Sequence, residues 1–152
     1  MNTIDDKSAA PRIAVVIPCY EVSRHLKKVI TGIGPEVSSI YCVEDGCPEN
    51  SAQEVQKQLP DESRLRIIRH NKNQGVGAAV LTGYKAAVED NADVIVKIDG
   101  DGQMDPAFIP QLAGYIIKGE ADYVKGNRFY HLESLKQMPR SRLLGNAGLS
   151  FL

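Results

Sequence analysis

Two carboxylates stand one residue apart at Asp99 and Asp101, separated by Gly100 and followed by Gln103. Because this group directly follows an apolar segment, a turn at Gly100 can bring both carboxylates to one divalent cation, and Gln103 can add a neutral oxygen. Hard oxygen ligands with open positions suit Mg²⁺ or Mn²⁺ that bridges substrate phosphates. The pattern predicts a metal site at Asp99, Asp101 and Gln103. The competing interpretation is an ordinary Asp-Gly turn without a ligand.

A run of small residues over 73–79 follows another apolar segment. Small residues let the backbone approach a ligand closely, and the start of the helix that follows favours anions, so Gly75 is predicted to contact a substrate. The alternative is a dinucleotide-binding fingerprint. However, Val80 stands where that fingerprint has its third small residue, and the run follows the third predicted strand rather than the first. A P-loop is excluded, because the sequence Gly-Lys-Ser or Gly-Lys-Thr that it requires occurs nowhere in the chain.

Three further residues follow predicted strands. Tyr20 can stack on a nucleobase or cap the core with its hydroxyl in water. Asp45 can accept hydrogen bonds from a base or ribose, or it can be a turn aspartate. Arg128 can neutralise phosphates. The last 30 residues hold five basic residues and one acidic residue, a net charge of +4, which leaves −5 for the first 122 residues. This basic stretch indicates either phosphate binding or a solvated basic face.

Continuous apolar segments alternate with helical patterns along the chain. Strands are predicted over residues 13–17, 39–43, 65–69, 93–98 and 121–126. Helices are predicted over 22–33, about 51–59 and about 76–90, with a fourth that has Asp105 as its N-cap and Pro106 at its first position. Such strands predict a mostly parallel α/β sheet with helices on both faces. Right-handed crossovers place the carboxyl ends of all strands on one edge, where α/β folds bind ligands.

Composition limits the class of protein. The 152 residues are 43% hydrophobic and 24% charged with a net charge of −1, which fits one globular domain and gives no basic field for nucleic acid. No apolar run approaches the roughly 20 residues that span a bilayer, and the start lacks the order of a signal peptide, so a cytoplasmic location is predicted. Cys19, Cys42 and Cys47 form no CxxC pair, which favours reduced structural thiols over a disulfide or zinc site.

The two ends of the chain carry separate expectations. Residues 1–11 are polar and are predicted to form a disordered tail. Near the other end, apolar residues share one helical face without a helix C-cap, which is typical of a docking helix or of an interfacial membrane helix that is cut short. We therefore expect a fragment of a longer protein.

Six blocks in this order resemble glycosyltransferases of family 2, which have the GT-A fold, and in particular the polyprenyl-phosphate (dolichol-phosphate mannosyltransferase-like) branch. The blocks are VVIPCY, VEDGCPENS, NQGVGAAVLTGY, DGDGQMDP, KGNRF and PRSRLLGN. The resemblance implies a GT-A (Rossmann-like) catalytic domain over 12–152, incomplete at its C-terminus. It implies inverting transfer of a hexose from a UDP- or GDP-sugar to a polyprenyl phosphate, with peripheral membrane contact through a missing C-terminal part.

The resemblance also assigns roles to residues. Metal ligands are expected at Asp99, Asp101 and Gln103, and catalytic roles at Asp101 and Arg128. Substrate contacts are expected at Pro18, Tyr20, Glu21, Val43, Asp45, Gly75, Asp99, Gly100, Asp101, Arg128 and Arg140. The chain departs from the usual pattern after the tyrosine, where Glu21-Val22 replaces Asn-Glu, and in the second block, where Glu44 replaces an aspartate.

Three other functions stay open at the level of the sequence. A saccharide hydroxyl acceptor would require a general base, and Glu133 is the only acid in the last 30 residues. A nucleotide-binding module without turnover would keep the donor site alone. An NAD-dependent oxidoreductase would use the 73–79 run as its fingerprint and would leave Asp101 and Gln103 without a role.

Overall fold

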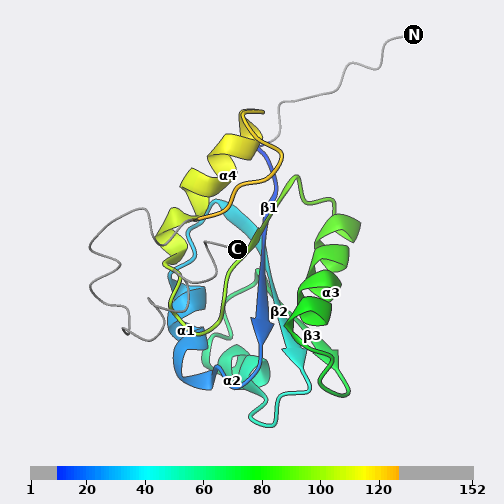
Figure 1. The fold of residues 1–152 in the computed structure, drawn as a ribbon. Helices are drawn as coiled ribbons and strands as arrows, with labels where there is room; N and C mark the ends of the chain where they lie inside the picture. Colours follow the sequence, from blue (N-terminus) through cyan, green and yellow to red (C-terminus); the bar gives the residue numbers. More distant parts are fainter. Residues whose placement is uncertain (1–9, 127–152) are drawn as a thin grey trace, which may run out of the picture.

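The computed structural model describes residues 10–126, which form one parallel sheet with helices on both faces (Figure 1). The strand order is β3-β2-β1-β4, and every pair is parallel. The strands are β1 (Ile13–Cys19), β2 (Val37–Asp45), β3 (Leu65–His70) and β4 (Val94–Lys97). The four strands predicted between residues 13 and 98 are confirmed, and their carboxyl ends share one edge of the sheet.

The helices divide between the two faces of the sheet. They are α1 (Ser23–Thr31), α2 (Ser51–Gln58), α3 (Val76–Glu89) and α4 (Ile109–Ile117), with a 3₁₀ turn, η1 (Pro106–Phe108), before α4. Helices α1, α2 and α4 cover one face, and α3 covers the other (Figure 1). The central strand β1 is therefore buried on both sides, which explains its unbroken apolar sequence.

Helix α3 lies unusually close to the sheet at Gly83. A Cβ atom at this position would collide with the Val16 side chain and would come within 3.2 Å of Val43. The small residues Ala79 and Ala87, one turn before and one turn after Gly83, are also fully buried. The run of small residues that begins at 73 thus has a packing role along α3 as well as a position near the carboxyl edge.

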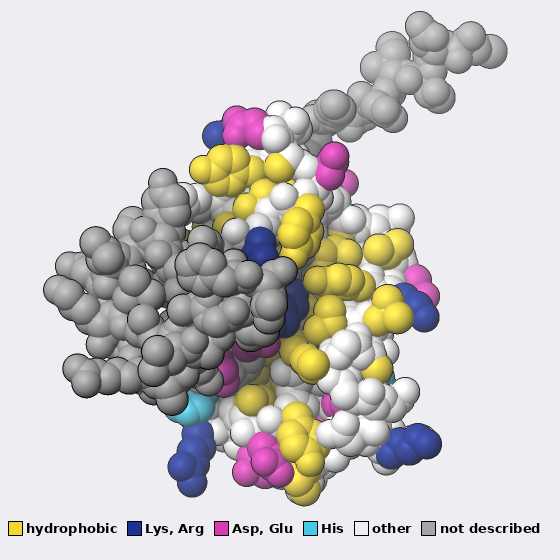
Figure 2. Space-filling view, in the orientation of Figure 1, with side chains coloured by type: hydrophobic (Ala, Val, Ile, Leu, Met, Phe, Trp, Pro, Cys, Tyr) yellow, Lys and Arg dark blue, Asp and Glu magenta, His cyan; other side chains and the backbone are white. Residues whose placement is uncertain are grey.

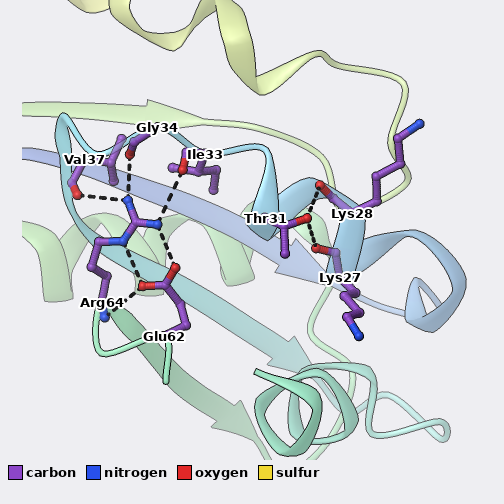
Figure 3. Close-up of polar contacts among 8 residues, drawn as sticks. All are labelled: Lys27, Lys28, Thr31, Ile33, Gly34, Val37, Glu62 and Arg64. Atoms are coloured by element: carbon purple, nitrogen blue, oxygen red, sulfur yellow. Dashed lines mark hydrogen bonds and ion pairs between the residues drawn. The ribbon is translucent and has the colours of Figure 1, made fainter. Parts of the chain in front are cut away.

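Arg64, just before β3, joins the amino ends of β2 and β3 (Figure 3). Its guanidinium donates to the backbone carbonyls of Gly34 at 2.6 Å, Val37 at 3.3 Å and Ile33 at 3.4 Å. It also pairs with Glu62 at 2.6 Å, which lowers the pKa of that carboxyl. These contacts tie the turn before β3 to the α1–β2 loop, so this end of the sheet is structural.

The predicted start of the fourth helix is confirmed, with one difference. Asp105 caps it, since its carboxylate accepts a hydrogen bond from Ala107 N–H at 3.0 Å. The first turn is 3₁₀ rather than α-helical because Pro110 has no N–H to donate to the Pro106 carbonyl, and Ile109 N–H donates to it instead. The α-helix proper begins at Ile109.

The prediction of a fifth strand over residues 121–126 is wrong. No backbone ladder joins this segment to any of the strands between residues 10 and 126. Its first residue instead closes the end of α4, where Ala121 N–H donates to the Tyr115 carbonyl. Tyr123 is 79% exposed, so the apolar sequence that suggested a buried strand is not buried here. A strand needs a partner for its N–H and C=O groups.

Two features of the surface complete the fold. Apolar side chains are exposed over α4 and beside α3 (Figure 2), among them Phe108, Tyr115, Leu81 and Val88. Across the described range 10–126, every helix is too short or too polar to cross a bilayer. All three cysteines are buried and none is in a disulfide within residues 10–126.

Candidate functional site

A cavity of about 380 Å³ opens at the carboxyl edge of the sheet. It brings together residues from the ends of β1, β2 and β4 and from the start of α3. Six residues predicted to contact substrate line it, namely Pro18, Tyr20, Asp45, Asp99, Gly100 and Asp101. Cys19, Val22, Asn73, Val76 and Ala79 complete the lining. Aromatic, amide and carboxylate groups therefore converge on one space at the place where parallel α/β sheets bind ligands.

Asp45 ends β2 and is the buried acid of this cavity. Its side chain is 5% exposed, and its oxygens accept three hydrogen bonds. Oδ1 accepts from His70 Nδ1 at 2.7 Å and from Gln74 N–H at 3.0 Å, and Oδ2 accepts from Gly75 N–H at 2.7 Å. Burial raises the pKa of Asp45, but these hydrogen bonds outweigh burial and lower it below 3.8. The group is thus an ionised, firmly held acceptor.

The loop between β3 and α3 rests directly on the end of β2. Gly46 has a positive φ of 61°, and a Cβ atom there would overlap the backbone of Lys72 and Asn73. Glycine at this position therefore permits both the turn after Asp45 and the close approach of the loop. The loop in turn places Asn73 and Val76 in the cavity wall. The end of β2 and the start of α3 form one unit.

Glu44, the neighbour of Asp45, has a structural role. Its carboxylate accepts from Ala52 N–H at 3.0 Å and pairs with Arg69 Nε at 3.0 Å. Asn50, the N-cap residue of α2, makes no side-chain cap, so Glu44 supplies the acceptor for that helix start. Successive residues of a strand point to opposite faces, which explains why Glu44 supports α2 while Asp45 contacts the α3 loop.

Asp99 and Asp101 lie in a turn after β4, and both are partly exposed. Lys97 Nζ lies 2.5 Å from Asp99 Oδ1, and Asp101 Oδ1 accepts from Gln103 N–H at 3.0 Å. Gly100 between them is buried, and a Cβ atom there would lie 3.1 Å from Val22 Cγ2. The turn is packed against the β1–α1 connection. The contacts made within residues 10–126 leave most of the lone pairs of both carboxylates unused.

These two carboxylates fit a magnesium or manganese ion that shares its coordination with a substrate. Residues 10–126 contain no group of three or more His, Cys, Asp or Glu side chains placed to hold a metal ion. The described residues therefore do not form a metal site whose ligands all come from the protein. Two carboxylates with open positions are the donor set that Mg²⁺ uses when phosphate oxygens and water complete its shell.

The connection after β1 combines an exposed aromatic with a strained backbone. Tyr20 lines the cavity and is 45% exposed, so its ring is available for stacking. Glu21 has a positive φ of 53°, which is uncommon for a residue with a side chain. Its N–H donates to Cys47 Sγ at 3.2 Å, and the next N–H, that of Val22, donates to Ser51 Oγ at 3.2 Å. These bonds to the start of α2 hold Tyr20 at the cavity.

Other predicted site residues lie elsewhere. Val43 is fully buried in the sheet, and its side chain lies near α3 at Gly83. Gly75 is the N-cap residue of α3, its N–H donates to Asp45, and a Cβ atom there would meet open space. Glu21 and Gln103 are exposed and follow residues that line the cavity. Arg128 and Arg140 lie outside the described residues.

Three residues at this edge of the sheet were not predicted from the sequence. Asn73 lines the cavity, His70 binds Asp45, and Thr82 Oγ1 lies 2.9 Å from His70 Nε2. The position of His70 at the end of a predicted strand was a usable signal. However, its contact with Asp45 spans 25 residues and depends on the pairing of β2 with β3, in which these two residues are register partners.

Comparison with known proteins agrees with the geometry. Residues 14–151 match the family model for glycosyl transferase family 2. A UDP-N-acetylglucosamine–dolichyl-phosphate N-acetylglucosaminyltransferase of Methanococcus voltae is 33% identical, over 92% of this chain and 61% of the relative. A dolichol-phosphate mannosyltransferase of Pyrococcus furiosus is 28% identical, over 90% of this chain and 39% of the relative.

An undecaprenyl-phosphate mannosyltransferase of Micrococcus luteus is 24% identical, over 86% of this chain and 54% of the relative. The chain thus spans about 40 to 60% of the length of these three relatives. The family match, the parallel sheet and the cavity at its carboxyl edge agree with one another. The chain belongs to glycosyltransferase family 2 and has its GT-A-like α/β fold.

Proposed function

We propose that this chain forms the donor-binding part of an inverting glycosyltransferase that moves a sugar from a nucleotide-diphosphate sugar to a polyprenyl phosphate. The observation that carries the proposal is the cavity that joins Tyr20 and Asp45 with the carboxylate pair Asp99 and Asp101. The names of the relatives from three organisms support the acceptor class, since each specifies a dolichyl or undecaprenyl phosphate.

The cavity suggests how the donor lies. The nucleoside fits between Tyr20, which can stack on the base, and Asp45, which accepts a hydrogen bond from it. The diphosphate then points toward Asp99 and Asp101, the residues that would hold Mg²⁺ or Mn²⁺. When bound, the ion supplies charge neutralisation for the departing nucleoside diphosphate. Lys97, at Asp99, adds a positive charge on the same side.

The acids of the cavity favour a phosphate acceptor. The carboxylates among its lining residues are those of Asp45, Asp99 and Asp101. Asp45 is engaged by three hydrogen bonds, and the other two are the metal ligands of this proposal. A lipid phosphate is already ionised and attacks the anomeric carbon without a general base, whereas a sugar hydroxyl requires one. Arg128 and Arg140 are proposed to bind phosphates, and the complete protein to act at the cytoplasmic face of a membrane.

The test is transfer of sugar to a lipid acceptor by the complete protein. Undecaprenyl or dolichyl phosphate is incubated with UDP-N-acetylglucosamine, UDP-glucose or GDP-mannose, with Mn²⁺ or with a chelator, and the lipid product is measured by mass spectrometry. We expect product only with the phosphate and only with metal ion. Equal transfer to the polyprenyl alcohol, or to a saccharide hydroxyl, contradicts the proposal.

The alternative of a nucleotide-binding module needs a matched experiment. The same assay with the 152-residue chain alone distinguishes donor binding from turnover. Binding of a nucleotide sugar without product by both the chain and the complete protein would favour the module. Family membership removes the basis for an oxidoreductase, because the residues that suggested a dinucleotide fingerprint lie within the matched region 14–151.

A further inference from the structure

The number of free acceptor positions on Asp45 restricts what base it can recognise. An ionised carboxylate has about four acceptor positions, two on each oxygen. Oδ1 already accepts two hydrogen bonds, from His70 and from Gln74 N–H, and Oδ2 accepts one from Gly75 N–H. Among the partners that residues 10–126 supply, one acceptor position therefore remains, on Oδ2. Because the pKa of Asp45 is lowered, the group stays ionised near neutral pH and does not donate.

His70 is the side chain that occupies the second position on Oδ1. Its ring is 9% exposed and is held at both nitrogens, at 2.7 Å from Asp45 Oδ1 and at 2.9 Å from Thr82 Oγ1. An ionised carboxylate only accepts, so Nδ1 carries the hydrogen of the first bond. Thr82 belongs to α3, which fixes the ring between the end of β3 and that helix.

Asn73 adds a donor to the same wall of the cavity. Its Oδ1 accepts from Gly75 N–H at 2.9 Å, which orients the amide group of the side chain. The oxygen is therefore used within the loop, and the Nδ2 group is left to donate. Asn73 and Asp45 both line the cavity. The wall thus offers one free carboxylate acceptor position and one amide donor.

We propose that His70 sets nucleobase selectivity by leaving Asp45 a single acceptor position, which favours a uracil-type base over guanine. The proposal rests on the proposed function, because it assumes that the cavity binds the nucleoside of the donor. Uracil has one N–H between two carbonyl oxygens, so it needs one acceptor and accepts from Asn73. Guanine places a 2-amino group beside its ring N–H and needs a second acceptor, which Oδ1 no longer provides.

The test compares UDP, IDP and GDP binding to the chain by calorimetric titration with Mg²⁺. Inosine differs from guanosine only by the missing 2-amino group. The ratio of the IDP and GDP affinities therefore measures the effect of the second donor, because both bases are purines of similar size. We expect UDP to bind most tightly, and GDP to bind about tenfold more weakly than IDP, because its amino group is left unpaired. GDP binding as tight as IDP or tighter overturns the proposal.

Two substitutions test His70 itself. His70→Ala releases an acceptor position on Oδ1, so the GDP affinity should rise to at least that of IDP. His70→Asn keeps an N–H donor near the place of Nδ1 and should preserve the wild-type ratio. An unchanged ratio in His70→Ala overturns the role of His70, and thermal unfolding checks that both variants fold. If His70→Ala does not fold, the wild-type ratio still decides the selectivity, and His70→Leu, which also lacks a donor, tests the role of His70 in its place.

The outcomes separate this proposal from the proposed function. Tight GDP binding with Mg²⁺ refutes the selectivity and leaves a nucleotide-sugar transferase in place. Failure of all three nucleoside diphosphates to bind refutes the donor site and the selectivity together. A preference for UDP that persists in His70→Ala, with GDP still weaker than IDP, shows that another residue selects the base and overturns the proposal.

Discussion

The carboxylates at the ends of β2 and β4 line the same cavity but differ in their surroundings. Asp45, at the end of β2, is buried and accepts three hydrogen bonds from two different elements. Asp99 and Asp101, after β4, are partly exposed, and in the described part of the chain each carboxylate has one polar contact, with a residue two positions away. One carboxylate is fixed by the fold, and the other two have free coordination positions.

The difference follows from the cost of burying charge. A buried carboxylate is stable only when it is hydrogen-bonded. Asp45 therefore fixes the position of the groups that donate to it, including those of the loop at the start of α3. The exposed pair keeps its water and needs no such partners. We therefore expect the hydrogen bonds at the end of β2 to be permanent parts of the cavity. At the end of β4, we expect contacts that a bound cation can replace.

Substitution of Asp45 should have the largest effect on stability. Asp45→Ala leaves Gln74 N–H and His70 Nδ1 without their acceptor and takes from Gly75 N–H one of its two acceptors, so we expect a loss of about 3 kcal/mol in the free energy of unfolding. Denaturant titration measures it. Asp101→Ala is the matched control and should change stability by less than about 0.5 kcal/mol. Equal losses in both variants would contradict the contrast between the two strand ends.

Substitution of Asp99 should instead weaken metal-supported binding. We expect Asp99→Asn to lower the affinity for a nucleoside diphosphate in Mn²⁺ by about 30-fold, since it removes one of two charged ligands, and to leave the melting temperature almost unchanged. Calorimetric titration with and without Mn²⁺ measures this effect. A variant that binds as the wild type does in Mn²⁺ would remove Asp99 from the metal site.

Lowering the pH should reduce the stability of the folded chain through protonation of Asp45. Burial raises the pKa of Asp45, but the hydrogen bonds from His70, Gln74 and Gly75 lower it below 3.8 overall. The folded chain therefore binds the ionised form better than the unfolded chain does. This contribution to stability is complete above about pH 4 and is lost as the pH falls through the folded-state pKa.

We therefore expect the free energy of unfolding to fall more steeply with acid in the wild type than in Asp45→Asn, in which this group does not titrate. Denaturant titrations at a series of pH values from about 6 to about 3 measure the slope. Parallel slopes for the two proteins would show that Asp45 is not stabilised in its ionised form.

The smallest expected effect concerns Lys97. Its ammonium group lies 2.5 Å from Asp99 Oδ1 at a partly exposed position, where such pairs contribute little to stability. Lys97→Met removes a positive charge that competes with a cation, so we expect Mn²⁺ to bind about threefold more tightly. Electron paramagnetic resonance of free Mn²⁺ measures the affinity. Lys57→Met, at an exposed pair with Glu54, is the control and should have no effect.

Much of the sheet follows from local sequence. The segments at 13–17 and 39–43 are continuously apolar because β1 and β2 lie at the centre of the sheet, where both faces are largely buried. The segments at 65–69 and 93–98 form the edge strands β3 and β4, which are less buried. The segment 121–126 was also predicted to be a strand but pairs with none of the strands in the described range. Local pattern indicates whether a segment can be a strand, whereas pairing depends on a neighbour elsewhere in the chain.

The sequence predicts which residues lie together at the candidate site, but not the hydrogen bonds and ion pairs that join them. Strand-end residues such as Tyr20, Asp45 and Asp99 share a cavity because parallel strands end on one edge. The contacts of Asp45 with His70 and of Glu44 with Arg69 each join positions 25 residues apart. They depend on the register of β2 with β3, which no short pattern in the sequence specifies.

The most direct test of a shared donor site is amide chemical-shift mapping of the isotope-labelled chain with UDP and Mg²⁺. We predict that the shifts concentrate at the amides of Tyr20, Asn73 and Val76 and of residues 99–101, and that Mg²⁺ strengthens UDP binding. The same titration with Asp99→Asn should lose the effect of Mg²⁺ but keep shifts near Tyr20 and Asn73. Shifts centred away from the carboxyl edge of the sheet, or UDP binding that Mg²⁺ does not change, would contradict a metal-assisted nucleotide site in this cavity.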